Sequence, residues 1–224
     1  MLVANVSGLM GGGRAAATLD YMQQDISTAT ASAYTFSSVS FGSATATRII
    51  VATIATRKSP APGISSVSIG GVSATLYLAI HASGDDYSTV IAIATVPSGT
   101  TGDIVVTCSG TTLGCIINTF RLDGFSSAVP ASQQSDATDP MSINVTCAAN
   151  VAVICHAINY KTSSPTMSWS GAAGVVEQSD TFIASVMCAS TAMILTTGSL
   201  SSANVDATPS LAFNHSSLQV ITIQ

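Results

Sequence analysis

Side chains that commonly carry out catalysis are sparse in this sequence, and the clearest candidate is a histidine beside a cysteine. Cys155 and His156 are adjacent and lie in an apolar run with the pattern of a β-strand. Consecutive side chains of a strand point to opposite faces of a sheet, so the thiol and the imidazole are not expected to meet. We therefore interpret His156 as a histidine of a sheet surface or of a satisfied core, not as a catalytic base.

Two groups of acidic residues have the spacing for other chemistry, but neither is complete. Asp85 and Asp86 follow His81 in a predicted turn. Carboxylate oxygens suit Ca²⁺, yet two of them fall short of the roughly six to eight ligands that this ion takes. Glu177 and Asp180 flank the start of a predicted strand, where acids usually protect a sheet edge from pairing. Glycoside hydrolysis would need two acids facing each other across a cleft, so we expect neither a metal site nor a hydrolase pair.

Motifs for nucleotide or acyl chemistry do not occur either. The glycine-rich stretch 8–14 is not followed by Gly-Lys-Ser/Thr, so it does not predict a phosphate-binding loop. The sequence also has no Gly-x-Ser-x-Gly elbow. We therefore predict no catalytic residue, no cofactor and no enzymatic activity.

The single tryptophan, Trp169, is the one candidate for ligand contact. It lies in the segment 165–171, which is expected to be a loop because of its proline and glycine. In a sugar-binding sandwich, such a loop tryptophan would offer a rigid apolar face to a sugar ring. The alternative is that Trp169 fills the end of the sandwich core.

The cysteines leave two interpretations open. None of the five forms a Cys-x-x-Cys pair, and no histidine lies at zinc-finger spacing from them. They are either buried thiols that act as small hydrophobic side chains, or they form one or two disulfides with an odd thiol left for an intermolecular bond. The residues concerned are Cys108, Cys115, Cys147, Cys155 and Cys188.

Composition narrows the class of protein. Hydrophobic residues make up 47% of the 224 residues and charged residues only 8%, with a net charge of −5. No apolar run approaches the ~20 residues that span a bilayer, so a membrane protein is not expected. The basic residues are scattered, so no patch is available to neutralise a nucleic-acid backbone. A surface of hydroxyls and few charges repels neighbours weakly, which favours a protein that stays attached to partners.

Strand patterns begin near Tyr34 and recur to the end of the chain. Runs such as 47–56 are rich in β-branched residues, and Gly70-Gly71 lies between two alternating segments, which predicts a hairpin. About ten short strands at regular spacing favour an antiparallel β-sandwich, jelly-roll-like, over residues 34–224. Residues 1–33 carry a glycine run and read as an extended N-terminal arm that becomes ordered on a neighbouring subunit.

Several motifs in residues 34–122 are similar to β-rich virion proteins of tailed bacteriophages and prophages. They are Phe41-Gly42, Arg48-Ile49-Ile50-Val51, the hairpin from Val67 to Thr75, and Val96-Pro97-Ser98-Gly99. The resemblance implies a structural protein of a phage particle, in the capsid surface, neck or tail, and it supplies no catalytic residues. It also implies localisation in the virion.

We therefore expect a structural component of a phage particle, with a capsid-surface or decoration protein as the leading hypothesis. A tail or collar protein and a host-glycan-binding module are the alternatives. The expected partners are other virion proteins, namely the major capsid protein or tail and neck proteins. Identical copies are expected to associate by rotational symmetry, with a trimer as the first hypothesis.

Overall fold

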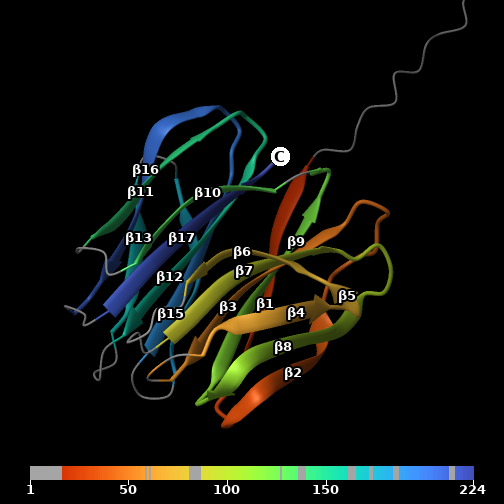
Figure 1. The fold of residues 1–224 in the computed structure, drawn as a ribbon. Coiled ribbons are helices and arrows are strands. Elements are labelled where there is room, and N and C mark those ends of the chain that lie inside the picture. Colours follow the sequence, from red (N-terminus) through yellow and green to blue (C-terminus); the bar gives the residue numbers. More distant parts are fainter. Residues whose placement is uncertain are drawn as a thin grey trace, which may run out of the picture.

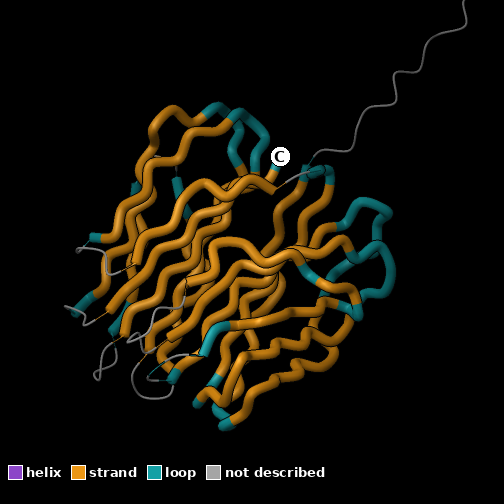
Figure 2. Tube along the Cα trace, in the orientation of Figure 1, coloured by secondary structure: helices purple, strands orange, loops and turns teal. Residues whose placement is uncertain are grey.

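A computed structural model describes residues 17–58, 60, 62–80, 87–126, 128–135, 140–160, 165–171, 174–183, 187–211 and 215–224. Its strands pair in antiparallel sheets, and these residues contain no helix (Figure 2). The prediction of an all-β, antiparallel fold is confirmed. No helix capable of crossing a membrane is found among these residues.

The first half of the chain forms two sheets that enclose a hydrophobic core (Figure 1). Sheet A has the order β1–β9–β3–β7–β6, with bounds β1 Thr18–Ser27, β9 Cys115–Asp123, β3 Ile49–Arg57, β7 Tyr87–Thr95 and β6 Thr75–Ile80. Sheet B has the order β2–β8–β4–β5, with bounds β2 Ala31–Ser40, β8 Thr101–Thr112, β4 Ile64–Ile69 and β5 Val72–Ser73.

The second half repeats this arrangement. Sheet C has the order β10–β17–β12–β15–β14, with bounds β10 Ala128–Ser135, β17 His215–Ile223, β12 Ala152–Tyr160, β15 Met187–Leu195 and β14 Val176–Ile183. Sheet D has the order β11–β16–β13, with bounds β11 Met141–Cys147, β16 Leu200–Pro209 and β13 Met167–Ser170. Sheets C and D enclose a second core.

The two halves share one topology. Taken in chain order, β1 to β4 correspond to β10 to β13, and β6 to β9 correspond to β14 to β17, while β5 has no counterpart. The sequence predicts one sandwich over residues 34–224, whereas the described strands divide into two, with β9 (Cys115–Asp123) the last strand of the first sandwich and β10 (Ala128–Ser135) the first strand of the second. The duplication escapes sequence inspection because only the alternation of buried and exposed positions is repeated, and many different residues satisfy it.

The two sandwiches stack through their larger sheets, so the molecule has four layers in the order B, A, C and D (Figure 1). A third apolar cluster fills the space between sheets A and C, with Val51 and Phe120 from one side and Ile154 and Ile221 from the other. The outer strands also meet across this interface, β6 with β10 and β1 with β14. The two sandwiches are therefore related by an approximate local twofold rotation.

Stacking explains why the central strands are apolar on both faces. In β3, Ile50 and Ile54 point into the first core, whereas Ile49 and Val51 point toward sheet C. A strand that is buried on both faces reads as a nearly continuous hydrophobic run. Part of the low charge content therefore reflects two doubly buried sheets and not the outer surface alone.

Residues 18–33 differ from the arm predicted for residues 1–33. Thr18–Ser27 form β1, which pairs with β9 along its length, and β2 begins at Ala31. Leu19 is buried, and the Tyr21 ring contacts Phe120 edge to face at 5.4 Å. The polar run Gln23-Gln24-Asp25 gives this strand no apolar alternation in the sequence. In the structure, Gln24 contacts Asn118 of sheet A and Thr181 of sheet C. Residues 1–16 lie outside the described residues.

The five cysteines are free thiols in the structure. Cys108, Cys115, Cys155 and Cys188 are buried, and Cys147 is half-buried. Burial raises the pKa of the Cys115 and Cys155 thiols above the ordinary range, so both stay protonated at neutral pH. This arrangement corresponds to the first of the two interpretations, in which the thiols act as small hydrophobic side chains.

Candidate functional site, a polar layer between the two sandwiches

A layer of polar side chains interrupts the apolar contact between sheets A and C. Two apolar clusters flank it, one on each side along the strands. All of its central members are at most 1% exposed, so the layer is closed to solvent. The residues are Thr53, Thr89 and Asn118 from sheet A, and His156, Thr191 and Gln219 from sheet C.

Asn118 of β9 is the centre of one half of this layer. Its Oδ1 accepts hydrogen bonds from the Ser179 hydroxyl at 2.7 Å, the Gln24 amide at 3.0 Å and the Tyr21 hydroxyl at 3.2 Å. Ser179 belongs to β14 of the second sandwich, so this bond crosses the interface. A second crossing bond joins the Thr181 hydroxyl to Gln24 Oε1 at 2.7 Å. Together these bonds attach β1 and β9 to β14.

Gln219 of β17 makes the crossing contacts in the other half. The Thr89 hydroxyl lies 3.0 Å from Gln219 Oε1 and 2.9 Å from the Ile54 carbonyl oxygen, so it can donate to either. The Gln219 amide nitrogen donates to the Leu78 carbonyl oxygen. Leu78 has φ of 54°, a left-handed conformation that is unusual for a branched side chain. Gln219 thus holds an irregular point of β6 from the opposite sandwich.

Asn118 and Gln219 occupy equivalent positions in the two sandwiches. The Val96 amide donates to the Arg48 carbonyl and the Thr196 amide to the Val151 carbonyl, both at 3.0 Å, which aligns β3 with β12. In this alignment Thr53 corresponds to His156. Asn118 is the neighbour of Thr53, and Gln219 is the neighbour of His156. The fold therefore places one long amide from each sandwich against the other.

His156 is the group in this layer whose charge is most sensitive to pH. Its side chain is completely buried, and burial lowers the pKa of the imidazole to about 4. Main-chain groups at Ser190 and Ile54 act weakly in the opposite direction, and no carboxylate contributes. The imidazole is therefore neutral at pH 7. Cys155 points into the second core instead, so the prediction that the two side chains do not meet is confirmed.

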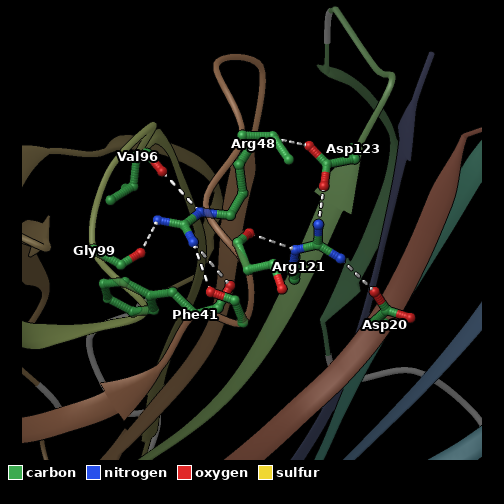
Figure 3. A network of polar contacts seen from close by, with 10 residues as sticks. Asp20, Phe41, Arg48, Val96, Gly99, Arg121 and Asp123 are labelled. Atoms are coloured by element: carbon green, nitrogen blue, oxygen red, sulfur yellow. Dashed lines mark hydrogen bonds and ion pairs between the residues drawn. The ribbon is translucent and has the colours of Figure 1, made fainter. Parts of the chain in front are cut away.

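Arg48 forms a second polar site, at the end of the first sandwich (Figure 3). Its guanidinium donates to the carbonyl oxygens of Val96, Ser98 and Gly99 at 2.8 Å each. It also donates to Gly42 at 2.9 Å and Phe41 at 3.3 Å. Arg48 thereby joins the segment 41–47 to the segment 96–100.

The charge of Arg48 is balanced by these carbonyl dipoles, because each of its hydrogen bonds ends on the main chain. The nearest ion pairs belong to Arg121, which bonds to Asp20 at 2.9 Å and to Asp123 (Figure 3). Burial and the Arg121 charge lower the pKa of Arg48, whereas Asp123 raises it. The sequence signal for this site was a single arginine directly before the apolar run Ile49-Ile50-Val51, which was noted only as part of a resemblance.

Trp169, the residue singled out for glycan contact, belongs to β13 and packs against the second core. Its Nε1 donates to the Ser190 hydroxyl at 2.7 Å. The side chain is half-buried, so one part of the indole is committed to the protein itself. A role in glycan binding stays a prediction.

Of the acidic candidates, the structure describes Glu177 and Asp180, both on β14. The Asp180 carboxylate accepts hydrogen bonds from the Met167 amide and from the Cys188 thiol, both at 2.8 Å, which is a structural role on the second core. Burial and the Asp180 charge raise the pKa of Glu177. His81, Asp85 and Asp86 lie outside the described residues. Among the residues that the structure describes, no group of three or more possible ligands could hold a metal ion.

Comparison with known proteins adds no family to this description. No protein-family model matches the chain, and no curated protein matches its sequence. The class of protein is therefore the one that the fold defines, a tandem of two stacked β-sandwiches joined by a buried polar layer. The crossing hydrogen bonds of this layer, such as those between Ser179 and Asn118 and between Gln219 and Leu78, join the two sandwiches.

Proposed function

We propose that this protein is a structural component of a bacteriophage particle, and within that class a capsid-surface or decoration protein. The resemblance of residues 34–122 to virion proteins suggested this class. The observation that carries the proposal is the chemistry of the two outer faces, on sheets B and D.

Both outer faces are nearly uncharged. On sheet B the outward side chains of β2, β4 and β8 are Thr35, Ser37, Ser66, Ser68, Asp103, Val105 and Thr107. On sheet D those of β11, β13 and β16 are Ser142, Asn144, Thr146, Ser168, Asn204, Asp206 and Thr208. Each face carries one carboxylate and no lysine or arginine. Depletion of charge is one part of the composition of an interface centre, and on this ground both faces are suited to contact neighbours.

The four-layer arrangement supports a mechanical role. Sheets A and C are buried on both faces and joined by hydrogen bonds, which makes the molecule a stiff spacer between its two outer faces. Its partners would be the major capsid protein, or tail and neck proteins, and copies of itself in a rotationally symmetric oligomer such as a trimer. Since Thr18–Ser27 and Ala31–Ser40 form strands, any arm contact would have to come from the chain before β1, and a jelly-roll-like fold is part of the same proposal.

The copy number and the position of the protein in purified particles test the proposal. Quantitative mass spectrometry of purified particles should give a copy number comparable to that of the major capsid protein, and cryo-electron microscopy should place the protein on the shell. A low copy number with density at the neck or tail would favour the tail or collar alternative. Absence from purified particles would overturn the proposal.

Variants of the outer faces test the observation behind it. Thr35→Lys and Asn144→Lys each place a charge at an exposed position of one outer face, on its outermost strand β2 or β11, without disturbing a core. Each is expected to lower incorporation into particles by about tenfold, because a buried unpaired charge weakens an interface. Val176→Lys on β14, which is 58% exposed and outside both faces, is the matched control. Equal incorporation of all three variants would contradict the role of the faces.

A further inference from the structure

The polar layer between the sandwiches contains buried atoms that form no hydrogen bond. The Thr53 hydroxyl, both ring nitrogens of His156 and the amide nitrogen of Asn118 have no partner among the residues that the structure describes. All three side chains are completely buried. Buried polar groups of native proteins are nearly always paired, either with another protein group or with an ordered water molecule. These atoms therefore indicate that the layer needs a further hydrogen-bonding group.

The unpartnered atoms come from both sandwiches and lie in one small region. Thr53 and Asn118 are opposite each other in the pairing of β3 with β9, so their side chains are neighbours on the face of sheet A that meets sheet C. The His156 ring comes from β12 of sheet C and lies beside the main chain at Ile54, the residue after Thr53. A single ligand between the sheets can therefore contact all three side chains.

The other members of the layer already have partners within the protein. The Thr89 hydroxyl lies 3.0 Å from Gln219 Oε1, and the Gln219 amide nitrogen donates to the Leu78 carbonyl oxygen. The Thr191 hydroxyl lies 2.9 Å from the hydroxyl of Ser179. Within the layer, the need for a further group is therefore confined to the three side chains with unpartnered atoms.

The hydrogen-bonding capacity of these atoms defines the ligand. A neutral imidazole has one nitrogen that donates and one that accepts. The main-chain groups beside the ring, at Ile54 and Ser190, favour its protonated form and so can only accept, and neither is within hydrogen-bonding geometry of it. The second ring nitrogen needs a donor, the Asn118 amide needs an acceptor, and the Thr53 hydroxyl can be either. The ligand must therefore donate as well as accept, and no charged side chain belongs to the layer to balance an ion.

We propose that the layer binds at least one internal water molecule, which bridges His156 of the second sandwich to Thr53 and Asn118 of the first. A buried water typically makes about three hydrogen bonds to groups that otherwise have none, which matches one atom from each of these residues. Thr53 is shorter than the histidine at the equivalent position of the other sandwich, and this difference leaves the room for the water. Apolar clusters on both sides along the strands enclose the site. The water therefore leaves only when the interface opens locally.

A high-resolution crystal structure of the full wild-type chain tests this site directly. We expect a water molecule roughly 2.7–3.2 Å from a ring nitrogen of His156, and at a similar distance from Thr53 Oγ1 or Asn118 Nδ2. A layer without water, in which the ring nitrogens bond directly to protein groups, would overturn the proposal. An ion or another molecule at this place would overturn it as well.

Magnetic relaxation dispersion of water tests the site in solution, because it counts the water molecules that stay in a protein far longer than those on its surface. The double variant Thr53→Val with His156→Phe removes the hydroxyl and both ring nitrogens, and it should lose at least one long-lived water. The matched control, Thr196→Val with His215→Phe, changes the same residue types outside the layer and should keep the wild-type number. Equal numbers in the wild type and in both folded variants would overturn the proposal. If the first variant fails to fold, the wild-type crystal structure alone decides.

Discussion

The two sandwiches close the same end of the same topology with different chemistry. In the first, residues 41–48 connect β2 to β3, and Arg48 ties this segment to residues 96–99 through main-chain carbonyls. In the second, residues 148–151 make the same connection, and the equivalent of Arg48 is Val151.

In the second sandwich, the Thr196 hydroxyl links the same two segments that the Arg48 guanidinium links in the first. The Thr196 hydroxyl accepts a hydrogen bond from the Val151 amide at 2.9 Å and lies 3.2 Å from the Ala148 carbonyl oxygen. Asn150, with φ of 60°, allows the tight turn. The short connection 148–151 is closed by a single hydroxyl and main-chain hydrogen bonds. The longer connection 41–48 leaves several carbonyl oxygens without main-chain donors, and the Arg48 guanidinium supplies those donors.

Replacement of Arg48 should cause the largest loss of stability among the substitutions at these equivalent positions. Arg48→Met keeps much of the volume but removes every donor, and a buried carbonyl left unsatisfied costs roughly 1–3 kcal/mol. We expect the free energy of unfolding of the first sandwich to fall by about 3–5 kcal/mol, after partial rearrangement of the two segments.

Spectroscopy can assign that loss to one sandwich. The only tryptophan, Trp169, lies in the second sandwich, so its fluorescence reports on that half while circular dichroism reports on both. In denaturant, the dichroism transition of Arg48→Met should separate from and precede the fluorescence transition. Arg121→Met, which removes ion pairs at the rim, is the control and should cost less than half as much. A shift below about 1 kcal/mol in Arg48→Met would contradict the role given to Arg48.

Thr53 and His156 occupy equivalent positions, but only His156 can titrate, so it makes the stability of the second sandwich depend on pH. Burial lowers the pKa of His156 to about 4, whereas an unfolded histidine titrates near 6.5. The unfolded chain therefore binds the proton more tightly. The stability from keeping this imidazole neutral is complete above about pH 6.5 and is lost as the pH falls toward 4, by roughly 3 kcal/mol in all.

His156→Thr gives both strands the same residue and isolates this titration. The difference in unfolding free energy between wild type and His156→Thr, measured from pH 7.5 to 4, should change by roughly 3 kcal/mol, because other titrating groups are common to both proteins. His215→Thr, at a half-buried position of the same sandwich, is the control. A difference that does not vary with pH would show that the imidazole is not held neutral by the interface.

The two long amides that cross the interface should matter equally if the local twofold relation is functional. Asn118→Ala and Gln219→Ala each leave crossing partners unsatisfied, which we expect to cost about 2 kcal/mol each. The two sites share one interface, so a double-mutant cycle should show coupling of about 0.5 kcal/mol or more. Strict additivity in denaturant unfolding would indicate two independent sites instead of one layer.

The smallest effect is expected at the counterpart of Arg48. Thr196→Val removes one hydroxyl while keeping the shape of the side chain, and it should cost about 1 kcal/mol. Fluorescence of Trp169 is the appropriate probe, since the change lies in its own sandwich. If Thr196→Val lowered the free energy of unfolding as much as Arg48→Met does, the hydroxyl and the guanidinium would be of similar importance, which would contradict the expected difference between the two ends.

The strands themselves could be predicted from the sequence with fair success. The run 47–56 is β3 within two residues, and the alternation around Gly70-Gly71 is the β4–β5 hairpin. Two predictions failed where polar residues form strands. The polar segment 126–140 has the composition that predicts a surface loop but contains β10, and residues 18–27, predicted to belong to an arm, form β1. Both are outer strands, whose polar side chains resemble those of loops.

The candidate sites were harder to predict, because their partners are far apart in the chain. Arg48 meets Ser98 and Gly99 across a separation of 50 or more residues. Gln219 meets Leu78 across 141 residues. A single arginine, asparagine or glutamine in a strand carries no local sign of which carbonyl or hydroxyl it will contact.

The sequence by itself therefore determined the class of the fold, because β-branched and alternating apolar residues favour extended backbone wherever they occur. Low charge likewise followed from the sequence, but the part of it that comes from two doubly buried sheets did not. Only the tertiary structure decided that the strands divide into two sandwiches, that sheets A and C bury both faces, and that a polar layer joins them. The physical reason is that strand identity depends on local pattern, whereas pairing and stacking depend on contacts between residues distant in sequence.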